Sequence, residues 1–156
     1  MVFAFLFIAA CGWRLQGAYT FPPQMAKTYI DVNDPYSQLA RDLTRSLSGS
    51  ERVTVVQNRE AATAVLHIIT DRQGKRVLSV STSGLAREYE VYYVVQYELL
   101  DSEGEVLLPP QQHLLTRQYL YDQSDILSKN READMLIDSM RQDMVRLMLR
   151  RLAAVE

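Results

Sequence analysis

The clearest pattern in the chain is an alternation of residue types over residues 89–100. One set of alternate positions is entirely apolar or aromatic: Tyr89, Val91, Tyr93, Val95, Tyr97 and Leu99. The intervening set is half polar: Glu90, Tyr92, Val94, Gln96 and Glu98. Successive side chains of a β-strand point to opposite faces of its sheet. The alternation therefore predicts a long strand with one face directed at a core.

Shorter apolar segments on both sides of this strand predict the rest of a sheet. They occupy residues 28–32, 53–56, 64–70, 77–81 and 114–121. The polar stretch 101–105 is typical of a hairpin. After it, residues 106–108 extend a strand that Pro109 and Pro110 are expected to break, because proline cannot donate to a strand ladder. The middle of the chain is therefore predicted to be an antiparallel meander.

Two segments have apolar residues at helical spacing. In the first, we expect Asp34 to cap the helix, Pro35 to occupy its first position and Gly49 to end it. Its apolar stripe is Tyr36, Leu39, Ala40, Leu43 and Leu47. The second helix is predicted over residues 124–152, with the stripe Ala133, Leu136, Ile137, Met140, Met144, Leu147 and Met148. Packing against the sheet explains this second stripe, and a membrane-surface helix is the alternative. The predicted fold class is α+β, with a single domain over residues 27–156.

Composition and charge narrow the classes of function. Hydrophobic residues make up 47% of the chain, charged residues 23%, and the formal net charge is −2. This balance argues against disorder and provides no basic field for nucleic acid. His67 and His113 have no further metal ligands at the usual spacing, and neither a nucleophile elbow nor a phosphate-binding glycine loop is present. The sequence therefore argues against an enzyme and predicts no metal and no cofactor.

The N-terminus carries an apolar run from Val2 to Ala10 that ends at Cys11, the single cysteine of the chain. The run is too short to span a bilayer but has the length of a signal-peptide core. Ile8-Ala9-Ala10-Cys11 is similar to a bacterial lipobox, so residues 1–10 are predicted to be a lipoprotein signal and Cys11 to be lipidated. Residues 11–26 are then an extended linker. The alternative for Cys11 is a small buried hydrophobe. No Lys or Arg precedes the run, so either the true start lies upstream or the segment is of another kind.

Basic residues near the ends of the predicted strands are candidate contacts for an anionic ligand. Arginine and lysine beside apolar strand surface suit an amphiphile that carries phosphate. The candidates are Lys75, Arg76, Arg87 and Lys129, with Arg72, Arg117 and Arg131 as further members of the set. For each of them, an ordinary solvated charge is the alternative interpretation.

Four short stretches of the chain follow one another in a recognisable order. They are Cys11-Gly12-Trp13-Arg14-Leu15-Gln16-Gly17; Asp31-Val32 with Asp34-Pro35-Tyr36-Ser37 and Leu39; Ala86 with Glu88-Tyr89; and Tyr121-Asp122 with Ile126-Leu127, Lys129, Glu132 and Met135. Each stretch alone is weak, but their order and spacing extend over essentially the whole mature chain. Together they resemble the LptE family of lipopolysaccharide-assembly lipoproteins.

This resemblance implies a fold, a location and a role. The fold would be two helices packed on one face of a four-stranded mixed, mostly antiparallel sheet. The protein would face the periplasm from the outer membrane, plug the lumen of the β-barrel translocon LptD and help to insert lipopolysaccharide into the outer leaflet. Lys129 matches a lysine that the family associates with lipopolysaccharide contact.

In this role, exposed tyrosines would contact the barrel, because tyrosine combines contact area with a hydrogen-bonding tip. Tyr92, Tyr119 and Tyr121 are the candidates. The alternative function is a lipid-anchored periplasmic accessory protein that presents lipid in a transport system without plugging a barrel.

Overall fold

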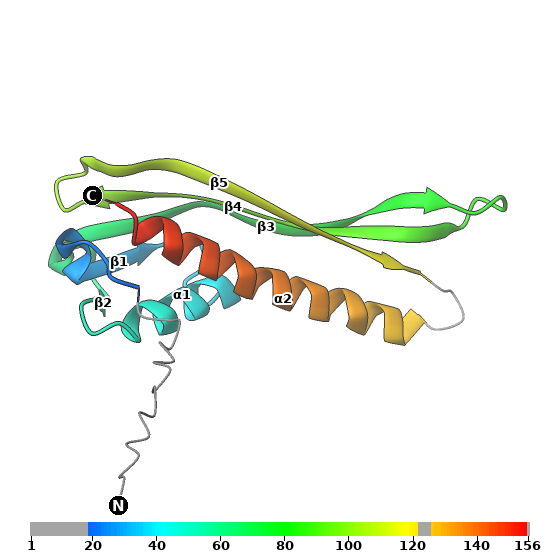
Figure 1. Cartoon of the computed structure of the whole chain (residues 1–156), viewed down its shortest axis with the longest axis horizontal. Coiled ribbons are helices and arrows are strands. Elements are labelled where there is room, and N and C mark those ends of the chain that lie inside the picture. Colours follow the sequence, from blue (N-terminus) through cyan, green and yellow to red (C-terminus); the bar gives the residue numbers. More distant parts are fainter. Residues whose placement is uncertain (1–18, 122–125, 156) are drawn as a thin grey trace, which may run out of the picture.

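The computed structural model describes residues 19–121 and 126–155, with the side chain of residue 126 left aside. The predicted signal peptide, Cys11 and the first part of the predicted linker lie outside these residues. The described chain forms one mixed sheet with two α-helices on the same face (Figure 1). This arrangement confirms the predicted fold class, although the sheet has five strands and not four.

The sheet has the strand order β2-β1-β3-β4-β5. Its strands are β1 (Lys27–Asp31), β2 (Thr54–Val56), β3 (Ala64–Val80), β4 (Ala86–Asp101) and β5 (Val106–Leu120). β1 pairs in parallel with both β2 and β3, whereas β3 with β4 and β4 with β5 are antiparallel. The fifth strand is β2, which the helix α1 (Gln38–Ser48) connects to β1 as the predicted crossover.

Strands β3 and β5 are each longer than the sequence predicted. The polar residues 71–76 continue β3 between its two predicted halves, because each of them pairs with β4. Pro109 and Pro110 lie within β5, and the predicted break there is wrong. β5 is an edge strand, and its register shifts between the positions opposite Tyr97 and Leu99, so a bulge accommodates the prolines.

The first helix begins later than predicted. Ser37 is its N-cap, and the Ser37 hydroxyl oxygen accepts a hydrogen bond from the Ala40 amide at 3.1 Å. Asp34 instead accepts from the Tyr36 amide at 2.9 Å in the preceding turn, and Tyr36 is 81% exposed. Asp34, Pro35 and Tyr36 therefore precede the helix, which ends at Ser48 before Gly49 as predicted.

The end of the predicted linker belongs to the folded domain. Residues Pro23–Ala26 form a 3₁₀ turn, and the side chains of Phe21 and Met25 are buried in the core. The apolar residues that flank the prolines therefore anchor this segment, so an extended linker over 21–26 is wrong.

The core lies between the sheet and the helices. α2 (Ile126–Leu152) packs on β4 and β5, and α1 packs against α2 and β2. The predicted alternation of β4 is confirmed, because Val91, Tyr93, Val95, Tyr97 and Leu99 are buried. The helices contribute Leu39, Leu43, Leu47, Met140, Met144, Met148 and Leu152. Beyond this core the β3–β4 hairpin projects past the start of α2 (Figure 1).

We expect that position 74 of β3 must be glycine because the Tyr92 side chain covers it. Tyr92 is the cross-strand partner of Gly74, and a Cβ added at Gly74 would lie 2.4 Å from the Tyr92 hydroxyl and 2.6 Å from its ring carbon Cζ. Gly74→Ala should therefore lower the free energy of unfolding by about 1–3 kcal/mol, as overpacking does. In a Tyr92→Ala background the same change should have almost no effect. Urea unfolding of the four variants measures the coupling, and an equal loss in both backgrounds would contradict the contact.

Candidate functional site

Three tyrosines gather where the ends of β4 and β5 meet. Tyr89 stacks on Tyr119 with ring centroids 5.8 Å apart, and it meets Tyr121 edge-on at 5.1 Å. Tyr89 and Tyr119 are direct cross-strand partners on the face that α2 covers. Tyr89, Tyr119 and Tyr121 are called the tyrosine cluster below. Offset and edge-on ring pairs are the geometries that aromatic rings prefer, so the cluster is a stable apolar surface with polar tips.

Two of the candidate lysines join the tyrosine cluster from different elements. The Nζ atom of Lys75, on β3, lies 5.5 Å from the centre of the Tyr89 ring. Lys129, in the first turns of α2, acts on the Tyr119 hydroxyl electrostatically, and its Nζ lies 2.8 Å from a carboxylate oxygen of Glu132. Residues from β3, β4, β5 and α2 thus place the Lys75 ammonium group beside an aromatic ring and the Lys129 ammonium group within electrostatic reach of Tyr119, an arrangement suited to anionic and sugar groups.

The hydroxyl of Tyr119 has an unusual position in this cluster. Its side chain is 5% exposed, and its hydroxyl oxygen is buried without a hydrogen-bond partner among the described residues. Burial, with the nearby Tyr89, Tyr121 and Glu132, raises the pKa of Tyr119, and Lys129 opposes this shift. A buried hydroxyl without a partner costs stability, so the Tyr119 oxygen is an unsatisfied hydrogen-bonding group within the cluster.

The other candidates lie elsewhere. Arg76 and Tyr92 are on the opposite face of the sheet, where the Arg76 Nε donates to Glu90 at 2.7 Å and Tyr92 covers Gly74. Glu90 is 7% exposed, whereas the side chain of Arg76 is 63% exposed, so only the carboxylate of this ion pair is removed from water. Arg87 is exposed at the start of β4, and its carbonyl accepts from the Tyr121 amide at 2.8 Å. The structure therefore brings Lys75, Lys129, Tyr119 and Tyr121 together and leaves Arg76, Arg87 and Tyr92 outside the cluster.

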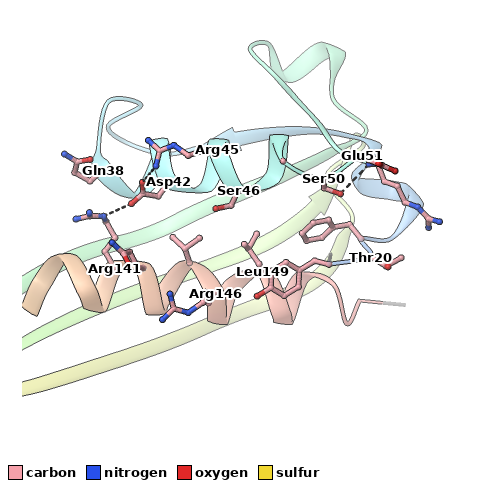
Figure 2. Close-up of a pocket in the computed structure, with 16 residues that line it drawn as sticks. Thr20, Gln38, Asp42, Arg45, Ser46, Ser50, Glu51, Arg141, Arg146 and Leu149 are labelled. Carbon is pink, nitrogen blue, oxygen red and sulfur yellow. Dashed lines mark hydrogen bonds and ion pairs between the residues drawn. The ribbon is translucent and has the colours of Figure 1, made fainter. Parts of the chain in front are cut away.

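A groove of about 1210 Å³ lies between α1, α2 and the segment that enters the domain at Tyr19 (Figure 2). Arginines line it, but carboxylates neutralise most of them. Asp42 pairs with Arg45 at 3.0 Å and with Arg141 at 2.8 Å, and Arg146 pairs with Asp143. Because the charges are compensated within the protein, this groove offers less attraction to an anion than the tyrosine cluster does.

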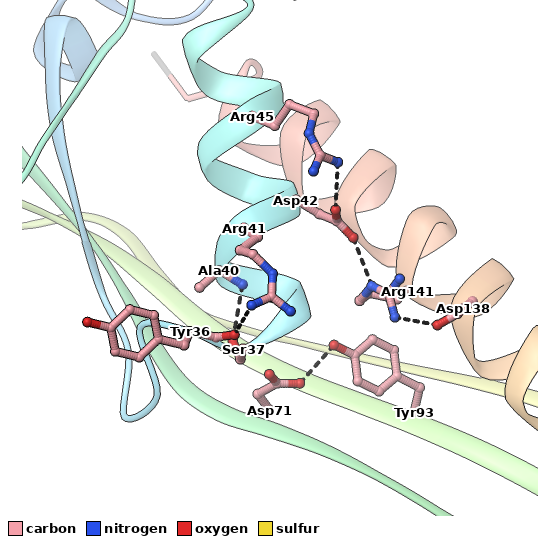
Figure 3. A network of polar contacts seen from close by, with 10 residues as sticks. All are labelled: Tyr36, Ser37, Ala40, Arg41, Asp42, Arg45, Asp71, Tyr93, Asp138 and Arg141. Atoms are coloured by element: carbon pink, nitrogen blue, oxygen red, sulfur yellow. Dashed lines mark hydrogen bonds and ion pairs between the residues drawn. The ribbon is translucent and has the colours of Figure 1, made fainter.

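The ion pairs beneath the groove link the two helices. Arg141 of α2 donates through Nε to Asp42 of α1 and through Nη1 to Asp138, at 2.8 and 2.7 Å (Figure 3). The Arg141 side chain is 14% exposed, and its two hydrogen-bonded carboxylates raise its pKa despite burial. Nearby, the Tyr93 hydroxyl donates to Asp71 of β3 at 2.7 Å. Burial, followed by the neighbouring Asp71 carboxylate, raises the pKa of Tyr93. The ion pairs therefore fix the two helices relative to each other, and the Tyr93–Asp71 hydrogen bond links β3 to β4 beside them.

Sequence reasoning missed four members of these sites. Tyr89 was assigned to the core by the alternation of β4, and only its proximity to the strand end signalled a different role. Glu132 is one turn beyond Lys129, a spacing that does indicate an ion pair on a helix. The Asp42–Arg141 pair joins residues 99 positions apart, and nothing in the local pattern predicts it.

The comparisons with known proteins identify the family. The family model for LptE, described as lipopolysaccharide-assembly, matches residues 25–152. The chain belongs to the LptE family. The resemblance drawn from four short stretches of sequence is therefore confirmed.

Curated relatives and solved structures match this chain over most of their length. The LPS-assembly lipoprotein LptE of Photorhabdus laumondii is 28% identical over 152 residues, which cover 97% of this chain and 82% of the relative. That of Yersinia enterocolitica is 27% identical, with 97% and 72% covered. The solution structure of an uncharacterized lipoprotein B from Nitrosomonas europaea has a TM-score of 0.75 at 32% identity. The match covers 92% of this chain and 91% of that chain. Rare lipoprotein B from Shewanella oneidensis has a TM-score of 0.68 at 28% identity, with 82% and 94% covered.

Neither α1 nor α2 has the length and apolar character that crossing a membrane requires. Within residues 19–121 and 126–155, no three His, Asp or Glu side chains gather as metal ligands.

Removing the Tyr119 hydroxyl should stabilise the protein in the absence of a ligand. Tyr119→Phe keeps the ring stack with Tyr89 and removes a buried oxygen without a partner, so the free energy of unfolding should rise by about 1 kcal/mol. Tyr121→Phe, at a half-buried tyrosine of the same cluster, is the matched control and should change stability less. Thermal and urea unfolding measure both variants. A loss of stability in Tyr119→Phe would show that its hydroxyl is satisfied in solution.

The Arg141 ion pairs should contribute measurably to the packing of α1 on α2. Arg141→Met leaves Asp42 with only its more exposed partner, so we expect the free energy of unfolding to fall by about 2 kcal/mol. Arg146→Met removes an ion pair from an arginine that is 59% exposed and should cost at most about 0.5 kcal/mol. Equal losses in the two variants, measured by urea unfolding, would contradict the structural role of Arg141.

Proposed function

We propose that this protein acts in lipopolysaccharide assembly as a lipid-anchored outer-membrane protein. In this proposal it occupies the lumen of an LptD-type β-barrel and contacts lipopolysaccharide through the tyrosine cluster, Lys75 and Lys129. Membership of the LptE family supports the process, since the curated relatives are named LPS-assembly lipoproteins. The lipobox-like sequence at Cys11 supports the anchor, and two or more acyl chains would hold the domain firmly at a membrane.

The observation that carries the contact with lipopolysaccharide is the meeting of two lysines at the partly buried tyrosine cluster. Phosphate groups of the lipid would pair with the ammonium groups of Lys75 and Lys129. Sugar rings would lie against the partly exposed rings of Tyr89 and Tyr121. Each of these groups is already held in place by the fold, so little side-chain ordering is needed on binding.

The surface of the domain suits a position inside a barrel. The lumen of an outer-membrane barrel is polar, so a plug must present polar and aromatic groups and remain soluble before assembly. The outer face of β4 presents Tyr92, Gln96 and Glu98, and the Nδ1 atom of His67 lies 2.9 Å from Glu98 on the same face. Such a face can exchange hydrogen bonds with a polar wall without exposing the apolar core.

Loss of the two cluster lysines should weaken binding of purified lipopolysaccharide. We expect the Lys75→Gln, Lys129→Gln double variant to bind about tenfold more weakly, because charge-assisted hydrogen bonds to phosphate are lost. Lys27 is the remaining one of the three lysines in the chain, and it is exposed at the start of β1. Lys27→Gln is therefore the matched control and should retain full binding. Equal weakening by Lys27→Gln would show that only overall charge matters and would contradict a site at the cluster.

Recovery of partners with the acylated protein distinguishes a barrel plug from a lipid carrier. A stable equimolar complex with the barrel, recovered from detergent-solubilised outer membrane with the acylated chain as bait, is the result the proposal requires. A monomer that extracts lipopolysaccharide from membranes and retains no barrel would favour an accessory lipid carrier.

A further inference from the structure

The distal part of β3 has a free edge. β1 pairs with β3 only from Ala64 to His67, and from residue 70 onward the described residues pair β3 with β4 alone. The strand from residue 70 to residue 80 extends roughly 36 Å. Residues 71–73, 75–78 and 80 are exposed. This edge is called the β3 edge below, and it is long enough to pair with another strand.

The register shows which backbone groups of the β3 edge point outward. Two hydrogen bonds at the ends of β4 fix the direction of its backbone groups. The carbonyl of Arg87 accepts from the Tyr121 amide, and the amide of Asp101 donates to the Glu105 carbonyl. Odd-numbered residues of β4 therefore direct their backbone groups to β5. The even-numbered residues of β4 must then face β3, because backbone groups of successive residues alternate in direction. Their partners are Arg72, Gly74 and Arg76. The amides of Asp71, Gln73, Lys75 and Val77 therefore point away from the sheet.

Side chains along the β3 edge are mainly basic and then apolar. Arg72, Lys75 and Arg76 are exposed, with Arg76 paired to Glu90, and the acidic member, Asp71, accepts from Tyr93. Val77, Leu78 and Val80 follow, with exposed fractions of 48%, 42% and 59%. A second copy would set one net-positive edge against another, which like-charge repulsion disfavours. A partner strand would fit both the basic and the apolar part of the β3 edge if it placed acidic residues opposite the basic positions and apolar residues opposite Val77 and Val80.

We propose that the β3 edge accepts an extended acidic strand from a partner protein and adds it to the sheet. The outward amides and carbonyls of Asp71, Gln73, Lys75 and Val77 supply the backbone hydrogen bonds, as in other cases of strand addition. On the outer face Arg72 selects acidic side chains, whereas Arg76 is already paired with Glu90 and the Lys75 side chain lies on the helix face beside Tyr89. Only the identity of the partner rests on the proposed function, in which the barrel supplies the strand.

Proline variants test the backbone part of this proposal. Gln73→Pro and Val77→Pro each remove an outward amide without removing a bond to β4, so the domain should remain folded. Together they should lower recovery of the barrel with the acylated chain about tenfold. The alanine variants Gln73→Ala and Val77→Ala keep the amides and should retain the barrel. Gln118→Pro removes an outward amide from β5, at the opposite edge of the sheet, and should also retain it. Circular dichroism confirms folding of each variant.

Arg72→Glu tests the charge part. It should weaken barrel recovery at low salt, because it sets a carboxylate against the acidic strand, and the difference from wild type should shrink at high salt. Unchanged recovery at low salt would contradict the selection of acidic side chains.

Amide hydrogen exchange tests the edge without naming the partner. Exchange over residues 70–78 is compared between the purified acylated protein and the same protein in isolated outer membranes. Slower exchange in the membranes supports strand addition, and unchanged exchange overturns it. Exchange that is already slow in the purified protein and depends on its concentration would show pairing with a second copy and would also overturn the proposal.

The two proposals fail separately. If every proline variant recovers the barrel as wild type does, strand addition is wrong and the barrel partnership stands. If wild type recovers no barrel, the proposed function fails, and exchange in the membranes alone decides the β3 edge.

Discussion

Every other element of this protein is positioned by the long pairing of β3 with β4. The pairing runs from Ala64 opposite Asp101 to Val80 opposite Ala86. Near its first end, alternate side chains of β4 form the floor on which α1 and α2 pack. Past the end of β1, the same two strands continue with an exposed edge on β3. One continuous ladder thus supports both a buried core and an open part, and the two proposed contacts lie along the open part.

Polar interactions at the helix side of the sheet have a different role from those at the cluster. Asp42, Arg141 and Asp138 satisfy one another, as do Asp71 and Tyr93. Such completed networks hold α1 and α2 in one arrangement and offer little to a ligand. At the tyrosine cluster the balance is incomplete among the described residues, because the Tyr119 hydroxyl finds no hydrogen-bond partner there and Tyr119 is only 5% exposed. An incompletely satisfied, partly buried polar group beside cations is a reasonable place to expect an anionic or hydroxyl-rich ligand.

The cluster and the β3 edge are neighbours, and Lys75 belongs to both. Its ammonium group lies against the Tyr89 ring, while its backbone amide points away from the sheet. A strand added along β3 would therefore lie next to the surface proposed for lipopolysaccharide. Partner contact through the backbone and lipid contact through the side chain would then be adjacent without competing for the same atoms.

The sequence by itself determined the elements and the family. The alternation of β4, the stripe of α2 and the order of four short motifs are local, because side-chain direction in strands and helices follows from residue spacing. Tertiary structure decided what joins distant segments: the Asp42–Arg141 pair, the meeting of Lys75 with Tyr89, and the ladder that keeps polar residues 71–76 in a strand. Ser37 capped α1 in place of Asp34, because Asp34 accepts from the Tyr36 amide in the preceding turn and Ser37 from the Ala40 amide in the first turn of the helix. These choices depend on which chain segments become neighbours on folding, and residue spacing carries no record of that.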